Sequence, residues 1–283
     1  MITPSIKNPK KCWLCNQEGA LTGEHKFKRT DIKKALEHEG TKLIYHQNEV
    51  PRKTPLQSDN SDNLKFEKLL CNKCNGTLSQ PFDKAYEQFI SYVLSNFESI
   101  TRNGHIDFNE IFDEKVYENQ LNVIRYYYKH FCCRLAQNSI NIDTALIKFL
   151  RGAKRTEKLF VHFEIRADSW AILEKLKKEG EPTGNFYNSP LSIYGTKNEF
   201  EIVYSYTIID WFKVEFFYSD SLTKKMFVDL TQFYSRSKVP VRSLFHQHPE
   251  DILKGEQLQK LEFDLHPAPP RPEYMVSVVG NYF

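Results

Sequence analysis

The sequence predicts an α+β protein with a cysteine-containing N-terminal region, a helical middle and a mostly antiparallel sheet toward the C-terminus. Three observations support this fold class. Two Cys-x-x-Cys pairs lie within the first eighty residues. Apolar residues repeat at helical spacing from about residue 80 to residue 152. After residue 158, runs rich in aromatic and β-branched residues follow one another, as the strands of an antiparallel sheet do.

The bulk composition allows a folded core and restricts the class of protein. The chain has 283 residues, of which 40% are hydrophobic and 27% are charged, and its net charge is +3. This charge permits a nucleic-acid partner without requiring one. The first eleven residues lack the apolar segment of a secretory signal, and no run of about eighteen apolar residues could span a membrane. We therefore expect a cytoplasmic protein that does not associate with membranes.

The periodicity predicts the individual elements. Helices are expected from residue 80, with Pro81 in the first turn, at 117–135 as an amphipathic helix, and at 140–152, where Gly152 ends the helix. Residues 53–63 are expected to form a long exposed loop. The remaining elements are a helix at 167–179, strands at 158–165, 190–195, 199–210 and 211–220, and a Pro-rich linker before a last strand at 274–283. We expect two domains, 1–100 and 101–283.

The two cysteine pairs have the spacing of a metal site. Two residues between cysteines allow both thiolates to bind one tetrahedral ion, and two pairs complete its shell. In a reducing compartment this predicts a structural Zn²⁺, with free or regulatory thiols as the alternative. The four candidate ligands are Cys12, Cys15, Cys71 and Cys74.

The other two cysteines, Cys132 and Cys133, are adjacent and lie in a predicted helix. They face different directions and lack the spacing of a metal-binding pair. We expect them to be buried packing residues.

Side chains with useful chemistry lie beside both cysteine pairs. Glu24 and His25 follow the first pair, and Asn75 directly follows the second. This order resembles the HNH (ββα-metal) nuclease family, in which an acidic residue and a histidine lie on a strand and an Asn or His begins a helix. The resemblance covers about residues 1–95 and looks closest to an uncharacterised branch with EHKFK-like and CN-x-x-x-x-QPFD motifs. Residues 101–283 resemble no characterised family.

The resemblance implies a treble-clef, ββα-metal zinc module that hydrolyses nucleic-acid phosphodiesters, with DNA as the expected substrate. His25 would be the general base, because a neutral imidazole can take a proton from water near pH 7. Glu24 and Asn75 would hold one catalytic cation, Mg²⁺ or Mn²⁺, since these ions prefer oxygen ligands. The expected products carry 5′-phosphate and 3′-hydroxyl ends.

The sequence departs from the family pattern at several positions. Glu24 replaces the Asp that often precedes the histidine, and Phe27–Lys28 replaces a hydrophobic residue followed by Pro. Phe66 occupies the place of a loop asparagine that many members carry. Asn63, three residues earlier, is the side chain expected to orient the histidine instead.

Two residues of the second motif, Gln80 and Asp83, are expected to contact the metal ligands. Asp83 has a simpler alternative as an acidic residue in the first turn of a helix, where the helix dipole favours it. Asn75 could likewise be a helix cap.

Simpler roles also stay open for the residues of the first motif. Glu24 could pair with Lys26 or Lys28 on the surface. His25 could be a surface residue or an alternative zinc ligand.

Lysine and arginine are in local excess over acidic residues within residues 1–80. Such charges hold phosphates without reading a base sequence. An ordinary solvated surface is the alternative. The residues expected to contact nucleic acid are Lys26, Lys28, Arg29 and Lys73.

Three functional hypotheses follow. The first is a metal-dependent endonuclease. Its residues 101–283 would select the target, form a homo-oligomer or control the activity. The second is a non-catalytic zinc module that binds nucleic acid or protein. The third is a defence-type effector in which the C-terminal region is a sensor. The aromatic residues of this C-terminal region could line a ligand pocket or form the core of the sheet. They are Tyr204, Tyr206, Trp211, Phe212, Phe216, Phe217 and Tyr218.

Overall fold

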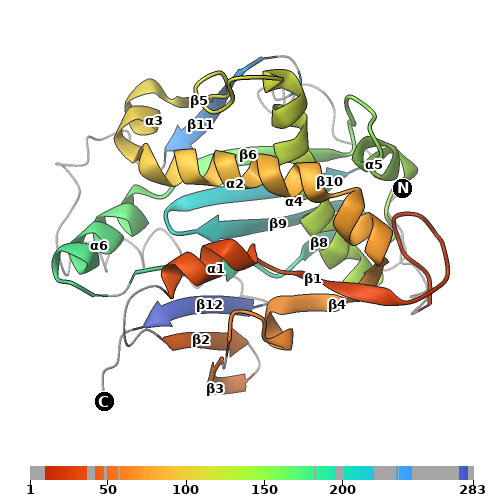
Figure 1. Ribbon diagram of the computed structural model, residues 1–283, viewed down its shortest axis with the longest axis horizontal. Coiled ribbons are helices and arrows are strands. Elements are labelled where there is room, and N and C mark those ends of the chain that lie inside the picture. The colour runs from red at the N-terminus through yellow and green to blue at the C-terminus, as the bar shows by residue number, and fades with distance from the viewer. Residues whose placement is uncertain are drawn as a thin grey trace.

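A computed structural model describes residues 10–36, 42–47, 50–56, 58–181, 183–195, 200–219, 234, 236–243 and 274–279. Within these residues, six α-helices pack with one large, mostly antiparallel sheet and one small two-stranded sheet (Figure 1). The α+β class predicted from the sequence is therefore confirmed. Among the described residues, no helix is both long enough and apolar enough to cross a membrane.

The small sheet pairs two antiparallel strands that are far apart in the sequence of the N-terminal region, and this strand pair is named the hairpin. Strand β1 (Leu21–His25) pairs antiparallel with β4 (Lys65–Cys71). Helix α1 (Arg29–Ala35) follows β1. A π-helical turn (Lys73–Thr77) follows β4 and leads into α2 (Gln80–Ser95). Both cysteine pairs therefore lie at the same end of this hairpin.

The large sheet has the order β3-β2-β12-β7-β9-β10-β6-β11-β5, with β8 beside β9. Its pairings are antiparallel except that of β11 with β6. All the predicted strands are present among the described residues, while positions 280–283 of the last predicted strand and the Pro-rich linker before it lie outside them. The strands are β2 (Lys42–Gln47), β3 (Val50–Pro55), β5 (His105–Asp107), β6 (Leu159–Ile165), β7 (Asn185–Asn188), β8 (Ser192–Gly195), β9 (Phe200–Ile209), β10 (Phe212–Ser219), β11 (Lys238–Ser243) and β12 (Tyr274–Val279).

One sequence-based expectation is corrected at the edge of this sheet. The predicted loop at 53–63 begins inside strand β3, which pairs with β2. Pro55, inside the predicted loop, pairs with Ile44 of β2, and proline is tolerated on an edge strand such as β3. A turn and a short 3-10 helix (Asp62–Leu64) then lead into β4.

The large sheet draws strands from both sides of residue 100. Strands β2 and β3 lie between the two cysteine pairs in sequence, yet β2 pairs with β12 near the C-terminus. The division into domains 1–100 and 101–283 stays a prediction, but the two parts share this sheet. The buried apolar residues likewise form one continuous cluster.

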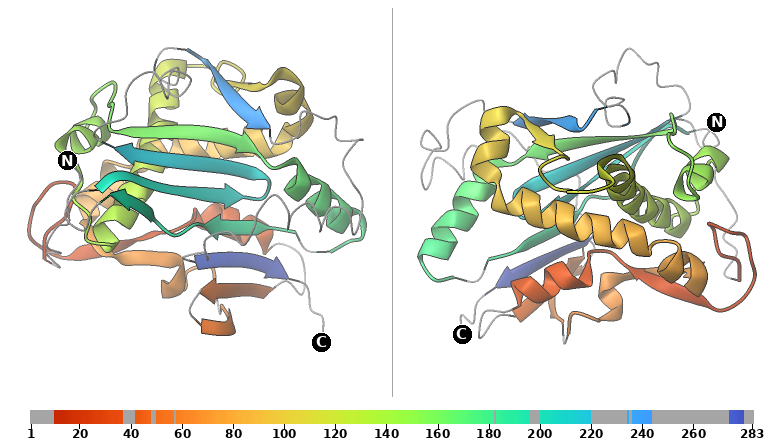
Figure 2. Two further views of the ribbon diagram at one scale, coloured as in Figure 1. Left: turned by 180° about the vertical axis from the view of Figure 1, so that it is seen from behind. Right: turned by 45° about the horizontal axis from the view of Figure 1, so that its top comes forward.

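The helices lie mainly across one face of the large sheet. Figure 2 shows α2 and α4 on this face, with α6 at the side. The sequence predicted α2, with Pro81 in its first turn, and α5, followed by Gly152 at a φ of +118°. It did not predict α3. The helices after α2 are α3 (Phe97–Asn103), α4 (Val116–Gln137), α5 (Thr144–Leu150) and α6 (Ala167–Lys178).

Helix α4 is the centre of the packing, and it corrects the prediction of an amphipathic helix. Every residue from Gln120 to Leu135 is buried, because α2, α5, β4 and the sheet contact it from different sides. Phe131, for example, stacks on Phe216 of β10. Cys132 and Cys133 are fully buried, which confirms their predicted packing role, and burial raises the pKa of both thiols.

Buried charges on α4 need partners, and two arginines find them in the backbone and polar side chains. Arg125 donates to the carbonyl oxygens of Phe149 and Ala153, both at 3.1 Å. Arg134 donates to the hydroxyl of Ser205 and the carbonyl of Ser189. These contacts fix α4 against α5 at one end and against the sheet at the other.

Helix α1 contains a buried acid that couples stability to pH. The Asp31 side chain accepts a hydrogen bond of 2.8 Å from the hydroxyl of Tyr86 on α2, and the residue is 8% exposed. Burial raises the pKa of Asp31 to about 6. Since the folded-state pKa lies above the unfolded one, ionisation destabilises the fold as pH rises through this interval.

We expect Asp31→Asn to stabilise the protein at pH 8, by up to about 3 kcal/mol, because the amide oxygen still accepts from Tyr86 without a buried charge. The advantage should shrink toward zero near pH 4, where the wild-type carboxyl is protonated in the fold. Chemical denaturation at both pH values measures this difference. A gain that is equal at both pH values, or a loss at pH 8, would contradict it.

Candidate functional site

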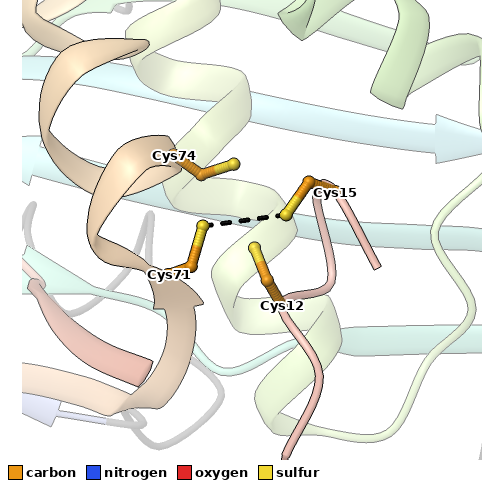
Figure 3. Close-up of side chains that lie close together, drawn as sticks. All are labelled: Cys12, Cys15, Cys71 and Cys74. Atoms are coloured by element: carbon orange, nitrogen blue, oxygen red, sulfur yellow. Dashed lines mark hydrogen bonds between the residues drawn. The ribbon is translucent and has the colours of Figure 1, made fainter. Parts of the chain in front are cut away.

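Four thiols from the two cysteine pairs meet at one end of the hairpin. Cys12 and Cys15 come from the first turn of the described chain, Cys71 ends β4, and Cys74 lies in the π-helical turn (Figure 3). Their sulfur atoms all lie within 4.8 Å of one another. The cluster predicted from the spacing is therefore present.

The dimensions of this cluster fit zinc. The Sγ atoms of Cys15 and Cys71 are 3.7 Å apart. A tetrahedral ion with sulfur ligands at about 2.3 Å places two sulfurs about 3.8 Å apart. Four sulfur donors leave no coordination position open, so a metal such as zinc held here has a structural role.

Local hydrogen bonds form the first cysteine turn. The N–H of Asn16 donates to the carbonyl of Cys12 at 2.7 Å, and Asn16 adopts a left-handed φ of +60°, which asparagine tolerates. The N–H of Trp13 donates to the carbonyl of Leu69 on β4 at 3.2 Å. The turn is therefore attached to β4, the strand that carries Cys71.

The two hairpin strands approach each other closely next to the Glu-His pair. A Cβ atom on Gly23 would lie 2.9 Å from the carbonyl oxygen of Phe66, so the approach requires glycine. The pairing register shifts on both sides of Gly23. Such bulges redirect the side chains that follow, here those of Glu24 and His25.

The amide of Asn75 has an orientation that the hydrogen bonds determine. The Thr22 hydroxyl donates to the carbonyl of Leu70 at 3.0 Å, so it can only accept from Asn75. The Asn75 Nδ2 group donates to that hydroxyl at 3.0 Å. Its Oδ1 atom therefore points elsewhere, and it is buried without a hydrogen-bond partner in the described part of the chain.

Two side chains of helix α4, Lys129 and His130, hold Glu24. The Nζ atom of Lys129 lies 3.2 Å from Oε1 of Glu24, and Nε2 of His130 lies 3.5 Å from the same oxygen. Burial raises the pKa of the Glu24 carboxyl, but Lys129 and His130 outweigh it and lower this pKa to about 2. Glu24 is thus ionised at neutral pH. Because both contacts use Oε1, Oε2 is the oxygen left to bind water or a metal.

His25 lies at the end of β1 and is partly buried. Its Nε2 atom is buried and has no hydrogen-bond partner among the described residues. Burial lowers the pKa of His25, although Glu24 acts in the opposite direction. The imidazole is therefore neutral at pH 7, the form that can accept a proton.

Asp83 joins this group, whereas Gln80 and Asn63 are exposed. Asp83 lies in the first turn of α2, and its Oδ1 atom is 3.6 Å from Nζ of Lys129. The side chain of Gln80 is at the surface. Asn63 uses its backbone carbonyl, which accepts from Lys26 at 3.0 Å. A role for the Asn63 amide in orienting His25 stays a prediction.

Most of the basic residues predicted to contact nucleic acid form contacts within the protein. Lys73 is exposed. The other three candidates have protein partners in the structure: Lys26 contacts the Asn63 carbonyl, Lys28 lies 3.6 Å from Asp83 and 3.4 Å from Glu87, and Arg29 donates to Asp59 at 2.6 Å.

Sequence analysis missed Lys129 and His130, which come from outside the region of the cysteine motifs. Lys129 is fully buried and contacts two carboxylates on different elements, Glu24 on β1 and Asp83 on α2. The one sequence feature that could have indicated them is a Lys-His pair inside the apolar stretch 121–135. A charge at such a position needs a buried partner, but the sequence does not name it.

Five buried polar atoms on β1, the π-helical turn, α2 and α4 have no hydrogen-bond partner among the described residues. Native structures leave few buried polar atoms without hydrogen bonds, and each needs an explanation such as a water, an ion or a substrate. Among the described residues, the ion pairs of Lys129 and His130 with Glu24 lack hydrogen-bond geometry. The unpartnered atoms here are His25 Nε2, Asn75 Oδ1, Asp83 Oδ1, Lys129 Nζ and His130 Nε2.

These five residues do not form a ready-made carboxylate and histidine cage. Within the described residues, only the four cysteines form a group of at least three His, Cys, Asp or Glu ligands with metal-binding distances. A cation beside Glu24 would therefore depend on donors of other kinds, such as the amide oxygen of Asn75 and water.

The aromatic residues of the C-terminal strands divide between the two faces of the sheet. Trp211, Phe212, Phe216 and Tyr218 are buried in the core. Tyr204 and Phe217 pair across β9 and β10 and are partly exposed, as is Tyr206. Most of the group is therefore sheet core, the simpler of the two sequence interpretations.

Searches against protein-family models, curated proteins and solved structures found no match for the chain.

We expect the purified chain to contain one zinc per molecule, and Cys71→Ser to lose it. Structural zinc in small domains contributes about 10–16 kcal/mol in peptide systems, so its loss should lower the unfolding temperature strongly. Elemental analysis and thermal unfolding with and without a chelator measure both effects.

Cys132→Ala is the matched control, since this buried thiol lies outside the cluster. It should keep the zinc and lose only about 1 kcal/mol of stability. Full zinc content in Cys71→Ser would contradict a four-thiolate site.

Proposed function

We propose that the chain is a metal-dependent endonuclease of the HNH type that hydrolyses phosphodiesters, with DNA as the expected substrate. One observation carries the proposal: two of the three predicted site residues, His25 and Asn75, have buried polar atoms without a hydrogen-bond partner among the described residues, and the third, Glu24, is a buried carboxylate paired with Lys129. The β1–β4 hairpin, the four-thiol cluster and α2 supply the ββα arrangement that such a site needs.

The proposed chemistry assigns one role to each residue. Glu24 and Asn75 would hold a divalent cation, Mg²⁺ or Mn²⁺, through an ionised carboxylate and an unpartnered amide oxygen. The cation would supply positive charge at the phosphate and at the departing 3′ oxygen. His25 takes a proton from the attacking water. The new bond joins water oxygen to phosphorus, the P–O3′ bond breaks, and the departing 3′ oxygen takes a proton from a solvent water, which leaves 5′-phosphate and 3′-hydroxyl ends.

Binding of the nucleic-acid backbone is proposed for Lys26, Lys28, Arg29 and Lys73. Lys73 lies between the two cysteines of the second pair and is exposed, as is Arg29. Lys28 and Arg29 would exchange carboxylate partners for phosphates on binding. Contacts of this kind predict weak sequence preference and a strong dependence on salt.

A second candidate is a zinc module that binds nucleic acid or protein without cleaving. The ion pair between Glu24 and Lys129 favours it, because a buried salt bridge can serve only to join the hairpin to α4. This candidate predicts salt-dependent DNA binding and no cleavage with either cation. A defence-type role is compatible with the first candidate and is a question for the genomic neighbourhood.

Cleavage of supercoiled plasmid by the purified full chain, with Mg²⁺ or Mn²⁺, distinguishes the two. We expect His25→Ala to reduce the rate by about 10²–10⁴-fold, the usual contribution of a general base. His105→Ala is the matched control, because this histidine lies on β5, away from the hairpin. It should keep the wild-type rate.

Nicks that DNA ligase can reseal would support the expected 5′-phosphate and 3′-hydroxyl ends. Equal rates in wild type and His25→Ala would contradict the mechanism. DNA binding without cleavage in either ion would favour the non-catalytic module.

A further inference from the structure

We propose that Lys129 is a positioning residue that holds Glu24 in place for the catalytic cation, so that helix α4 is part of the active site. This inference rests on the proposed function and deepens it. It assigns a role to a residue outside the region of the sequence motifs. It also explains why the nuclease-like hairpin and the C-terminal region share one core.

Lys129 connects the two elements that flank the proposed cation. Its Nζ atom lies 3.2 Å from Oε1 of Glu24 on β1 and 3.6 Å from Oδ1 of Asp83 on α2. Asn75, the second proposed ligand, lies in the turn between β4 and α2. One ammonium group therefore sets the distance between the strand and the helix on either side of the proposed site.

The charge on Lys129 differs from the other buried charges of α4. Arg125 satisfies its guanidinium with the carbonyl groups of Phe149 and Ala153 and with the side chain of Asn122. Among the described residues, Lys129 has the two carboxylates and the Tyr126 ring, whose centre lies 6.0 Å from its Nζ atom, and that atom makes no hydrogen bond of good geometry. A buried ion pair of this kind is often no more stabilising than apolar side chains of the same volume. The specific effect of this ion pair is to fix the position of the Glu24 side chain.

Lys129 can act only through its neighbours. Its side chain is 1% exposed, so it does not reach the substrate directly. It contacts Oε1 of Glu24, as does His130, and this leaves Oε2 to the cation. Partners that orient a ligating carboxylate commonly change metal affinity by about 10–100-fold when they are removed.

The test measures Mn²⁺ binding by the zinc-loaded full chain without substrate, from the electron paramagnetic resonance signal of free Mn²⁺. We expect Lys129→Met to weaken binding by about 10–100-fold. Lys129→Gln should do the same, and it is the second variant if the first does not fold. Lys129→Arg keeps the charge and should restore part of the affinity.

Arg125→Met is the matched control, since it removes a buried cation from the same helix without a contact to Glu24. It should lower the unfolding temperature and leave Mn²⁺ affinity within about twofold of wild type, because the proposed ligands keep their partners.

The outcomes separate the two proposals. If wild type binds no Mn²⁺, the proposed nuclease function fails. If wild type binds Mn²⁺ and a folded neutral variant at position 129 binds it equally well, only the role of Lys129 fails. Tighter binding in that variant would also overturn the role, because it would identify Lys129 as a competitor of the cation.

Discussion

The meeting of four thiols from two distant segments is the constraint on which the rest of the structure depends. Cys15 and Cys71 are 56 residues apart in sequence, yet their sulfur atoms are 3.7 Å apart. A metal that joins the two segments fixes the register of β1 against β4, and therefore the places of Glu24, His25 and Asn75. Because four sulfur donors leave no open ligand position, the proposed chemistry would have to occur beside the cluster. The structural metal would bind sulfur donors, and the proposed catalytic metal would bind oxygen donors.

Helix α4 provides the second fixed reference. Its middle is buried from every side, so each charge on it requires a partner, and each partner belongs to a different part of the fold. Arg125 contacts the end of α5, Lys129 contacts β1 and α2, and Arg134 contacts the large sheet. The hairpin with its proposed active site is therefore held against the C-terminal region by charge as well as by apolar packing. A free-standing N-terminal module would lack Lys129 and His130.

Short-range sequence patterns predicted the features of the structure that depend on residues close together in the chain. Cysteine spacing predicted the thiol cluster, and the pattern of apolar, aromatic and β-branched residues predicted α2, α4, α5, α6 and five strands of the large sheet. Pairings between distant segments were not predicted: β2 pairs with β12, which lies more than 200 residues later in sequence, and β3 pairs with β2. The same limit hid the contact of Lys129 with Glu24. The amphipathic interpretation of α4 was wrong because its second face also packs, although charges within an apolar stretch were a visible signal.

The central claim is that this fold holds two chemically different metals at neighbouring places. Anomalous diffraction from crystals grown with Mn²⁺, recorded at the zinc and manganese absorption edges, tests it most directly. The expected result is zinc among the four cysteine sulfurs and manganese bound to oxygens of Glu24 and Asn75 at roughly 2.1–2.2 Å, slightly longer than the distances usual for Mg²⁺. Zinc at the cysteines with no manganese beside Glu24 would contradict it.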